Sequence, residues 1–485
     1  MPTRAFPGDD FHTAEQTGKD LAYLQRLLEE IHPNLYEYRS RRELQRIWRE
    51  IQGSVSGPQE RWQVINLVQR MLASVCDEHT KVHLGAEFKK ISTSEAIYLG
   101  HNLVSTKSRL YLDDEESGYR GRDLAEIGGR TSAEIRNFLE GIVSTDGCIR
   151  DGTVFTRQHD DAIALHLSQF LGHPTQYDFR FQKPDNTVVM PGMRRRKLFA
   201  RSNKNDFRQR ASQLKPVGIG WTALDYLRTD LKNGFGIAAG QSADRAYAYI
   251  YMQGFEDSSL QTDELYRIMR KLIHDKPKHV ILDLTDSPGG YIPQAQRLVS
   301  YFLPRSHKIY SSYYRKSLAY VPDDTYSLLE GVNAKLRKTD LKNFQKNARR
   351  QKGRYVFKLL PKSLGNPDYK GKLTILVSPK TKSAAILAAI ALQRERKTAV
   401  VGFRGEGVLG SSCFRADGIV TLPVTRVKLR IAESCYDRFA ARPSGTDHLT
   451  IDYPIDPLAQ PFRKMNQTIL KAGVEQVLRQ TPKAD

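Results

Sequence analysis

LTILVSPKTKSAAILAAIAL, residues 373–392, runs from apolar to polar and back to apolar. Residues 373–377 are rich in Leu, Ile and Val and too few for a helix, which predicts a buried strand. Residues 384–392 are nine small or branched apolar residues, which predicts a buried helix. The polar residues between them have two interpretations. One is a surface turn with Thr381 or Ser383 as the helix N-cap. The other makes Ser383 a nucleophile at the positive end of the helix.

The same alternation continues over the C-terminal half of the chain. Strands are predicted at 246–252, 279–284, 372–377 and 398–403, and helices at 290–303 and 383–395. Strands that alternate with helices indicate an α/β fold whose mixed or parallel sheet is joined by crossover helices.

The N-terminal part follows different patterns. Residues 14–75 keep helical apolar spacing, and the His32–Asn34 stretch (HPN) breaks the first helix because the residue before proline avoids the helical region. From about 85 to 235 the apolar runs shorten into strands with one helix, which begins at Ser132. We therefore divide the chain into a helical part (1–84), a β module (85–235) and an α/β part (236–485) with a basic insertion near 335–354.

The charge balance is unusual for a chain of 485 residues, of which 40% are hydrophobic and 27% charged. A formal net charge of +21 favours acidic partners such as nucleic acid, an anionic polymer or a membrane surface. Two stretches concentrate it, Arg194–Arg210 and Lys335–Arg354. A solvated face or a mobile insertion is the favoured interpretation of each, since neither has a recognition motif or interleaved stacking aromatics.

The four cysteines form no CxxC pair, which argues against a structural zinc site. Cys413 and Cys435 flank two strand-like runs and could meet across a hairpin. The first residues lack an apolar h-region, so no signal peptide is predicted. This pattern suits a cytoplasmic chain, or a periplasmic or secreted chain whose leader has been removed. The longest apolar run, nine residues, is too short to span a membrane.

Two further fragments have chemical potential. Residues 279–304 read as a buried strand, a Gly-Gly turn and a helix, and glycines there leave backbone N–H groups open to an anion. Taken alone, this is a tight strand-to-helix turn. Residues 74–84 (SVCDEHTKVHL) place a histidine at the end of the helical part.

Together the fragments resemble the tail-specific, or C-terminal-processing, serine peptidases. The stretch ILDLTDSPGG is similar to that family's Asp-x-Arg-x-Asn-x-Gly-Gly strand end, and TKSAA to its Thr-Ala-Ser-Ala turn. RERKTAVVG and DEHT resemble two further family motifs, in the same order and spacing. Residues 111–135 resemble part of a degenerate PDZ-like module. The resemblance implies a crotonase/ClpP-like catalytic subdomain, peptide or protein substrates, and no metal or organic cofactor.

The resemblance assigns roles residue by residue. Ser383 falls at the nucleophile position, and the N–H groups of Gly289 and Ala384 fall where the oxyanion hole forms. Val408 and Ser412 occupy the positions of the lysine and glutamine of the Ser-Lys branch, so that dyad is absent.

The branch similar to the tricorn core and to retinoid-binding-protein-like repeats uses a histidine instead, and His79 stands at its place in chain order. The glutamate of that branch is replaced by Ala441 and Arg442. Substitutes for it are Glu433, Asp437, Glu78 and Asp77.

These assignments predict a serine peptidase with His79 as base. Two alternatives stay open: a catalytically silent relative that binds peptide or another ligand, and a basic scaffold for anionic polymers. The sequence indicates no oligomeric state.

Overall fold

The computed structural model describes residues 11–84, 97–99, 101–114, 117–148, 154–155, 161–172, 175–194, 221–227, 236–242, 244–303, 312–316, 326–328, 349–351, 354–358, 369–403, 413–414, 418–437, 449–456, 458 and 465–480. The chain forms two compact units. Unit 1 comprises Met1–Ala200, Tyr310–Leu360 and Ser412–Ala441, and unit 2 comprises Arg201–Ile309, Pro361–Ser411 and Arg442–Asp485. Each is described by itself.

Unit 2 is built on one mixed sheet in the strand order β11-β12-β13-β14-β19-β20-β25. The strands from β13 to β25 are parallel, and β11 and β12 extend the sheet antiparallel. Their bounds are β11 (Trp221–Leu227), β12 (Ile237–Ser242), β13 (Tyr247–Met252), β14 (His279–Asp283), β19 (Lys372–Val377), β20 (Ala399–Phe403) and β25 (Tyr453–Ile455).

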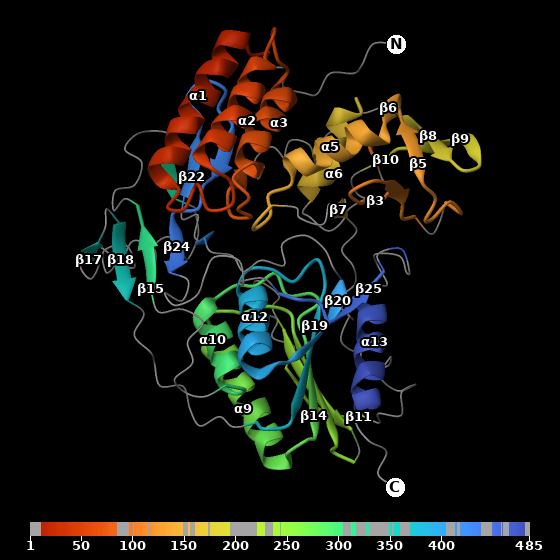
Figure 1. Ribbon diagram of the computed structural model, residues 1–485, viewed down its shortest axis with the longest axis vertical. Coiled ribbons are helices and arrows are strands. Elements are labelled where there is room, and N and C mark those ends of the chain that lie inside the picture. The colour runs from red at the N-terminus through yellow and green to blue at the C-terminus, as the bar shows by residue number, and fades with distance from the viewer. Residues whose placement is uncertain are drawn as a thin grey trace. The chain divides into compact units, whose positions relative to one another are not determined.

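Helices cover both faces of this sheet (Figure 1). They are α9 (Ser259–Asp275), α10 (Ile292–Ser300), α12 (Ala384–Arg396) and α13 (Met465–Gln480). The crossover helices α10 and α12 pack together, and α13 packs on β14, β19 and β20. Residues 384–392 of α12 are buried throughout, which explains why that helix is apolar on every side. The predicted α/β fold with a mixed sheet and crossover helices is confirmed.

Unit 1 begins with three packed helices (Figure 1), as predicted for residues 14–75. These are α1 (Ala14–Ile31), α2 (Arg41–Gly53) and α3 (Arg61–Ala73). Thr13 caps α1 and Ser40 caps α2 through their side chains. Leucines of α1 join Trp48 of α2 and Val68 of α3 in one core, together with residues 420–431 far along the chain.

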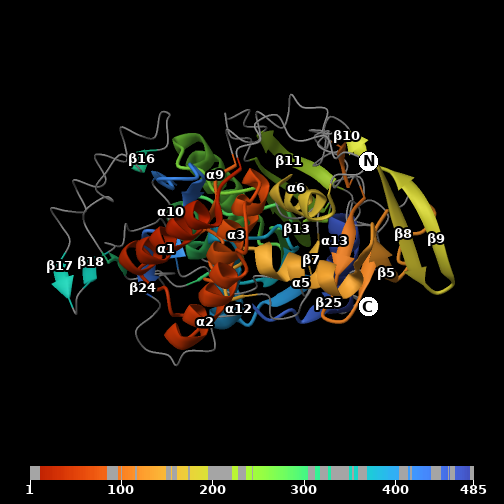
Figure 2. The ribbon, with the colours of Figure 1, turned by 90° about the horizontal axis from the view of Figure 1, so that it is seen from above.

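The β module follows within unit 1. Its elements are β2 (Ile97–Tyr98), β3 (Leu103–Ser105), β4 (Leu110–Leu112), β5 (Leu124–Ile127), β6 (Arg130–Thr131), α5 (Ser132–Ile142), β7 (Val154–Phe155), α6 (Asp161–Phe170), β8 (Gln176–Gln182), β9 (Asp185–Pro191) and β10 (Met193–Arg194). Strands β8 and β9 form a twisted hairpin (Figure 2). The predicted helix from Ser132 is α5. The prediction of one helix was wrong, because the short apolar run of α6 is ambiguous between strand and helix. The PDZ-like assignment of this module stays a prediction.

Two more sheets complete unit 1, in the orders β1-β23-β22-β16 and β17-β18-β15-β24-β21. Their strands are β1 (Lys81–Val82), β15 (Ser312–Arg315), β16 (Tyr326–Leu328), β17 (Arg349–Gln351), β18 (Arg354–Lys358), β21 (Cys413–Phe414), β22 (Gly418–Thr421), β23 (Lys428–Arg430) and β24 (Ser434–Asp437). Segments that the sequence-based division counts with the α/β part thus lie in unit 1. The division at 84 and 235 stays a prediction.

Two disulfides cross-link unit 1. Cys413 and Cys435 face each other on β21 and β24 and are bonded, so they meet on neighbouring strands. Cys76 and Cys148 form a second disulfide that the sequence did not indicate, since 72 positions separate them. Most of the two basic stretches lies outside the described residues. Among the helices that the structure describes, none has the length and apolar character needed to cross a membrane.

Candidate active site

The polar turn between β19 and α12 is fastened to the end of β14. The Ser378 hydroxyl donates to the carbonyl of Thr285. The Thr381 hydroxyl donates to the carbonyl of Leu284 at 2.8 Å and accepts from the Ser378 N–H at 2.9 Å. Two of the hydroxyl residues between strand and helix therefore serve the turn itself.

Ser383 does not take part in this network. It is the N-cap residue of α12, yet its side chain makes no capping hydrogen bond, unlike Thr13, Ser40 and Ser258 in other helices. Its φ of 49° and ψ of −125° lie in a sparsely populated region that costs about 1–3 kcal/mol. Strain of this kind is typical of a nucleophile on a sharp strand-to-helix turn. The side chain is half-buried, and its hydroxyl has no hydrogen-bond partner among the described residues.

Gly289 lies directly against Ser383. A Cβ at Gly289 would stand 2.7 Å from the Ser383 Cβ and 2.8 Å from the Ala384 nitrogen, and φ there is +92°. Only glycine fits this position. Within the described part of the chain, the N–H groups of Gly289 and Ala384 donate no hydrogen bond. The structure thus brings together three predicted site residues of unit 2, with two open donors beside one serine.

A carboxylate stabilises this arrangement from behind. Asp286 accepts from Lys380 at 3.2 Å, from Asn466 of α13 at 2.8 Å and from Tyr251 of β13 at 3.2 Å. Asp286 precedes the Gly-Gly turn and Lys380 precedes Ser383. Their contact therefore ties the two turns together at the carboxyl ends of β14 and β19, the edge where α/β sheets bind ligands.

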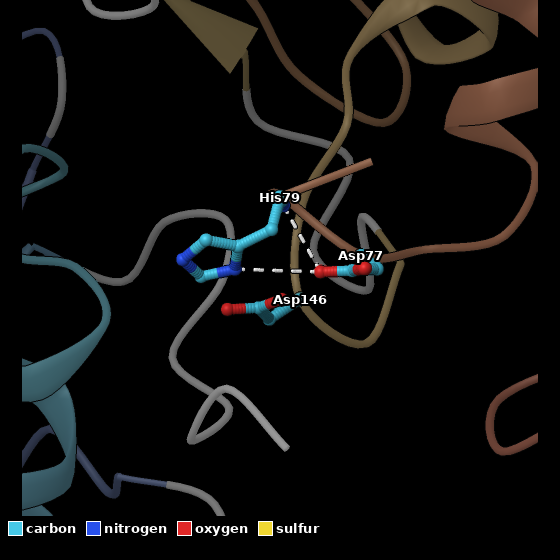
Figure 3. Close-up of side chains that lie close together, drawn as sticks. All are labelled: Asp77, His79 and Asp146. Carbon is cyan, nitrogen blue, oxygen red and sulfur yellow. Dashed lines mark hydrogen bonds and ion pairs between the residues drawn. The ribbon is translucent and has the colours of Figure 1, made fainter. Parts of the chain in front are cut away.

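The predicted base, His79, lies in unit 1, in the turn after α3. Asp77 is its main partner: the Asp77 carboxylate accepts the His79 N–H at 3.0 Å and lies 3.5 Å from His79 Nδ1. Figure 3 shows the ring with Nδ1 turned toward Asp77 and with Asp146 beside both. About 23% of the His79 side chain is exposed, so the ring can reach solvent or substrate.

Three carboxyl groups set the charge of His79. Burial alone would lower its pKa, but the hydrogen bond and charge of Asp77, with the charges of Glu78 and Asp146, raise it to about 9. Burial opposes the charge on Asp77, yet hydrogen bonds from His32 and His79 hold the pKa of its carboxyl far below the usual range. Burial and the neighbouring Glu78 and Asp77 raise the pKa of Asp146.

The same three residues are a candidate cation site in the searched, described part of the chain. Ligand atoms of Asp77, His79 and Asp146 lie within 4.8 Å of one another. The Asp77 oxygens already accept hydrogen bonds from His32, Thr80 and the His79 N–H, and Asp146 accepts one from the Glu78 N–H at 3.1 Å. These donors satisfy the cluster without an ion.

The other acids named from the sequence have different neighbours. Glu433 forms a buried ion pair with Arg315. Asp437 ends β24 opposite Ser312, and only its backbone is described. The Glu78 N–H bonds Asp146. Val408, Ser412, Ala441 and Arg442 lie outside the described residues.

Sequence reasoning missed Asp146 and His32. Nothing in the sequence connects residue 146 to residue 79. His32 had only one signal, its place directly before a proline at a helix end.

This chain is similar to known proteins in part of its sequence and in its fold. Residues 246–427 match a family model described as peptidase family S41. The structure entitled "Structure of mature CPAF complexed with lactacystin" aligns with a TM-score of 0.52 at 13% identity, over 96% of this chain and 97% of that one. The structure entitled "Crystal Structure of cpaf s499a mutant" aligns with a TM-score of 0.53 at 12% identity, over 96% of both chains. At such identities the likeness shows the fold alone. No curated protein matches the chain.

Proposed function

We propose that the chain is a serine peptidase of the S41 type, with Ser383 as nucleophile and His79 as base; the match of residues 246–427 to the model of peptidase family S41 supports this proposal. One observation carries the proposal. Ser383 holds an unpartnered hydroxyl on a strained turn, among the described residues, against the N–H groups of Gly289 and Ala384. A peptidase of this type hydrolyses the peptide bonds of peptide or protein substrates.

The chemistry follows from what each group can do. Ser383 Oγ attacks the scissile carbonyl carbon while His79 Nε2 takes its proton, since Nδ1 faces Asp77. The carbonyl oxygen gains negative charge, and the Gly289 and Ala384 N–H groups stabilise it. Each such donor is worth about 3 kcal/mol in the transition state.

His79 then returns the proton to the leaving amine, and the C–N bond breaks. A water molecule attacks the acyl-enzyme, with His79 again taking a proton, and releases the second product and Ser383. No step calls for a lysine, in keeping with Val408 at the lysine position of the Ser-Lys branch.

Asp77 is our choice for the orienting acid, ahead of Glu433, Asp437 and Glu78. Its carboxylate contacts His79 both at the backbone N–H and at Nδ1. The Glu433 carboxylate is instead occupied by Arg315. The proposal therefore departs from the late glutamate that the histidine-using branch supplies.

The proposal places one demand on the whole chain. His79 belongs to unit 1 and Ser383 to unit 2, so catalysis requires the two units to bring them within hydrogen-bond reach.

The test is peptide hydrolysis by wild type, Ser383→Ala, His79→Ala and Ser259→Ala, on a library of unstructured peptides analysed by mass spectrometry. Ser259 is an exposed serine of α9 in the same unit and serves as the matched control. We expect cleavage by wild type and Ser259→Ala only. Peptides bound but not cut by wild type would instead support the silent relative.

We propose separately that the basic stretches contact an anionic polymer or membrane surface. The net charge of +21 supports this idea. Binding to heparin or to anionic vesicles should weaken steeply as salt rises and be unchanged in Ser383→Ala. Binding that does not depend on salt, or no binding at all, would refute this proposal for the basic stretches.

A further inference from the structure

We propose that His32 is a positioning residue that acts on His79 through Asp77. The inference rests on the proposed function and extends it to the first helix of the chain. It assigns the end of α1 a role in catalysis that its sequence does not suggest.

His32 is buried at the C-cap of α1, with 2% of its surface exposed. Pro33 follows it, which favours an extended backbone at His32 and ends the helix there. The ring is thereby held in the interior, next to the Asp77 turn.

The orientation of the ring determines which nitrogen carries its proton. The Asn34 N–H points at His32 Nδ1 at 3.3 Å, so Nδ1 is the acceptor. His32 Nε2 therefore bears the proton and donates it to Asp77 Oδ2 at 3.0 Å. The acceptor is ionised, and hydrogen bonds to ionised groups are roughly twice as strong as neutral ones.

Asp77 is thus held at both oxygens. Oδ2 accepts from His32 and from the Thr80 hydroxyl at 2.7 Å, and Oδ1 accepts the His79 N–H at 3.0 Å and faces His79 Nδ1. Because His32 and Thr80 hold Oδ2, only Oδ1 of the Asp77 carboxylate can face the His79 imidazole. Loss of the His32 bond leaves the Thr80 hydroxyl as the single donor to Oδ2 among the described residues and frees the carboxylate to rotate.

Another buried histidine of unit 1 provides a contrast. His166 contacts the neutral amide of Asn66 instead of a carboxylate, and burial lowers its pKa to about 4. Removing the His166 ring removes a buried imidazole without touching Asp77. It is therefore the control for a purely structural role.

The experiment is a double-mutant cycle on peptide hydrolysis with His32→Leu, Asp77→Asn and the pair, plus His32→Gln and His166→Leu. Active sites are counted by the end point of fluorophosphonate labelling, so that unfolded protein does not count as slow enzyme. A glutamine amide can donate near the place of the imidazole Nε2, whereas leucine cannot.

We expect His32→Leu to lower kcat per active site about 10- to 100-fold, because misplacing a catalytic group costs rate rather than binding. KM should stay within about twofold, His32→Gln should recover most of the rate, and His166→Leu should keep it. In the Asp77→Asn background His32→Leu should change kcat less than about threefold, since coupled residues are not additive.

Three results would overturn the inference: unchanged kcat in His32→Leu, multiplicative effects of the two substitutions, or a raised KM with kcat intact. If His32→Leu does not fold, His32→Gln and His32→Asn decide. Glutamine reaches Asp77 and asparagine is too short, so equal rates for both would refute the role. Cleavage that survives Ser383→Ala would instead refute the proposed function, and the two failures are thus distinguishable.

Discussion

At the scale of single residues, the surroundings of His79 favour its protonated form, whereas a general base must be neutral. Its pKa is raised to about 9 by Asp77, Glu78 and Asp146 against the effect of burial. At pH 7 only about one molecule in a hundred would then carry the neutral imidazole that a general base needs. We therefore predict very low peptidase activity at neutral pH.

We accordingly expect kcat/KM to rise about tenfold per pH unit and to level off near pH 9. Asp146→Asn should move this rise to lower pH, because it removes one charge that favours protonated His79. Glu134→Gln, an exposed change on α5 in the same unit, is the matched control. A profile already flat from pH 6, or one that Asp146→Asn shifts upward, would contradict the assignment of His79.

The second prediction for a single residue concerns Gly289. Gly289→Ala would press a Cβ to 2.7 Å from the Lys382 carbonyl oxygen and from the Ser383 Cβ. The turn must shift, the Gly289 N–H must move away from the oxyanion, and kcat should fall at least about 100-fold. Gly172→Ala has a similar positive φ of +80° with open space around it, and it should lose stability but not rate. Near-normal cleavage by Gly289→Ala would exclude its N–H from the oxyanion hole.

At the scale of elements, the sequence predicted what local patterns control. The buried strand β19, the apolar helix α12 and the serine between them follow from residues 373–392, where period and composition agree. The conformation of Ser383 and its contact with Gly289 do not follow from them, because they depend on β14 and β19 being neighbours. The sequence suggested that β14 and β19 are neighbours only through the family resemblance.

The His79 turn shows the opposite case. Asp77 lies two positions before His79 and was among the candidates, whereas Asp146 and His32 reach the turn from distant segments. A disulfide between Cys76 and Cys148 and a bond from the Gly147 N–H to the Cys76 carbonyl at 2.9 Å hold the Asp146 loop there. No pattern within one segment encodes such a contact.

The prediction at the scale of elements concerns the disulfide between Cys76 and Cys148. Replacing Cys76 and Cys148 by serine should cost about 4 kcal/mol of unfolding free energy by loop closure, and replacing Cys413 and Cys435 about 3. The first pair should also lower kcat, because Asp146, whose carboxylate accepts the Glu78 N–H and so fixes the His79 turn, loses its anchor, and the second should change kcat much less. Chemical denaturation and peptide hydrolysis measure both quantities. Equal effects on kcat would show that the Asp146 loop is held without the disulfide.

At the scale of the whole molecule, the residues proposed for catalysis belong to two units. Ser383, Gly289 and Ala384 come from one, and His79 with its acids comes from the other. The proposed mechanism therefore requires His79 to come within hydrogen-bond reach of Ser383. Local patterns predicted the first helices of unit 1 and the α/β sheet of unit 2, but not the later segments that belong to unit 1 or the approach of His79 to Ser383, because these depend on contacts between segments far apart in sequence.

Thiol cross-linking tests that approach. All four native cysteines are in disulfides, so Ser383→Cys with His79→Cys would introduce a pair of free thiols. A short bifunctional thiol reagent should cross-link them, and Ser259→Cys with His79→Cys should not react in this way. Cross-linking only with long reagents, or equally in both pairs, would show that His79 does not come close to Ser383.

The central claim is that Ser383 is a nucleophile activated by His79. Its most direct test is labelling of wild type, Ser383→Ala and His79→Ala with a fluorophosphonate at pH 9, with the modified residue mapped by mass spectrometry. We expect a single adduct on Ser383 in wild type, none there in Ser383→Ala, and strongly slowed labelling in His79→Ala. An adduct on another residue, or folded wild type that never labels, would contradict it.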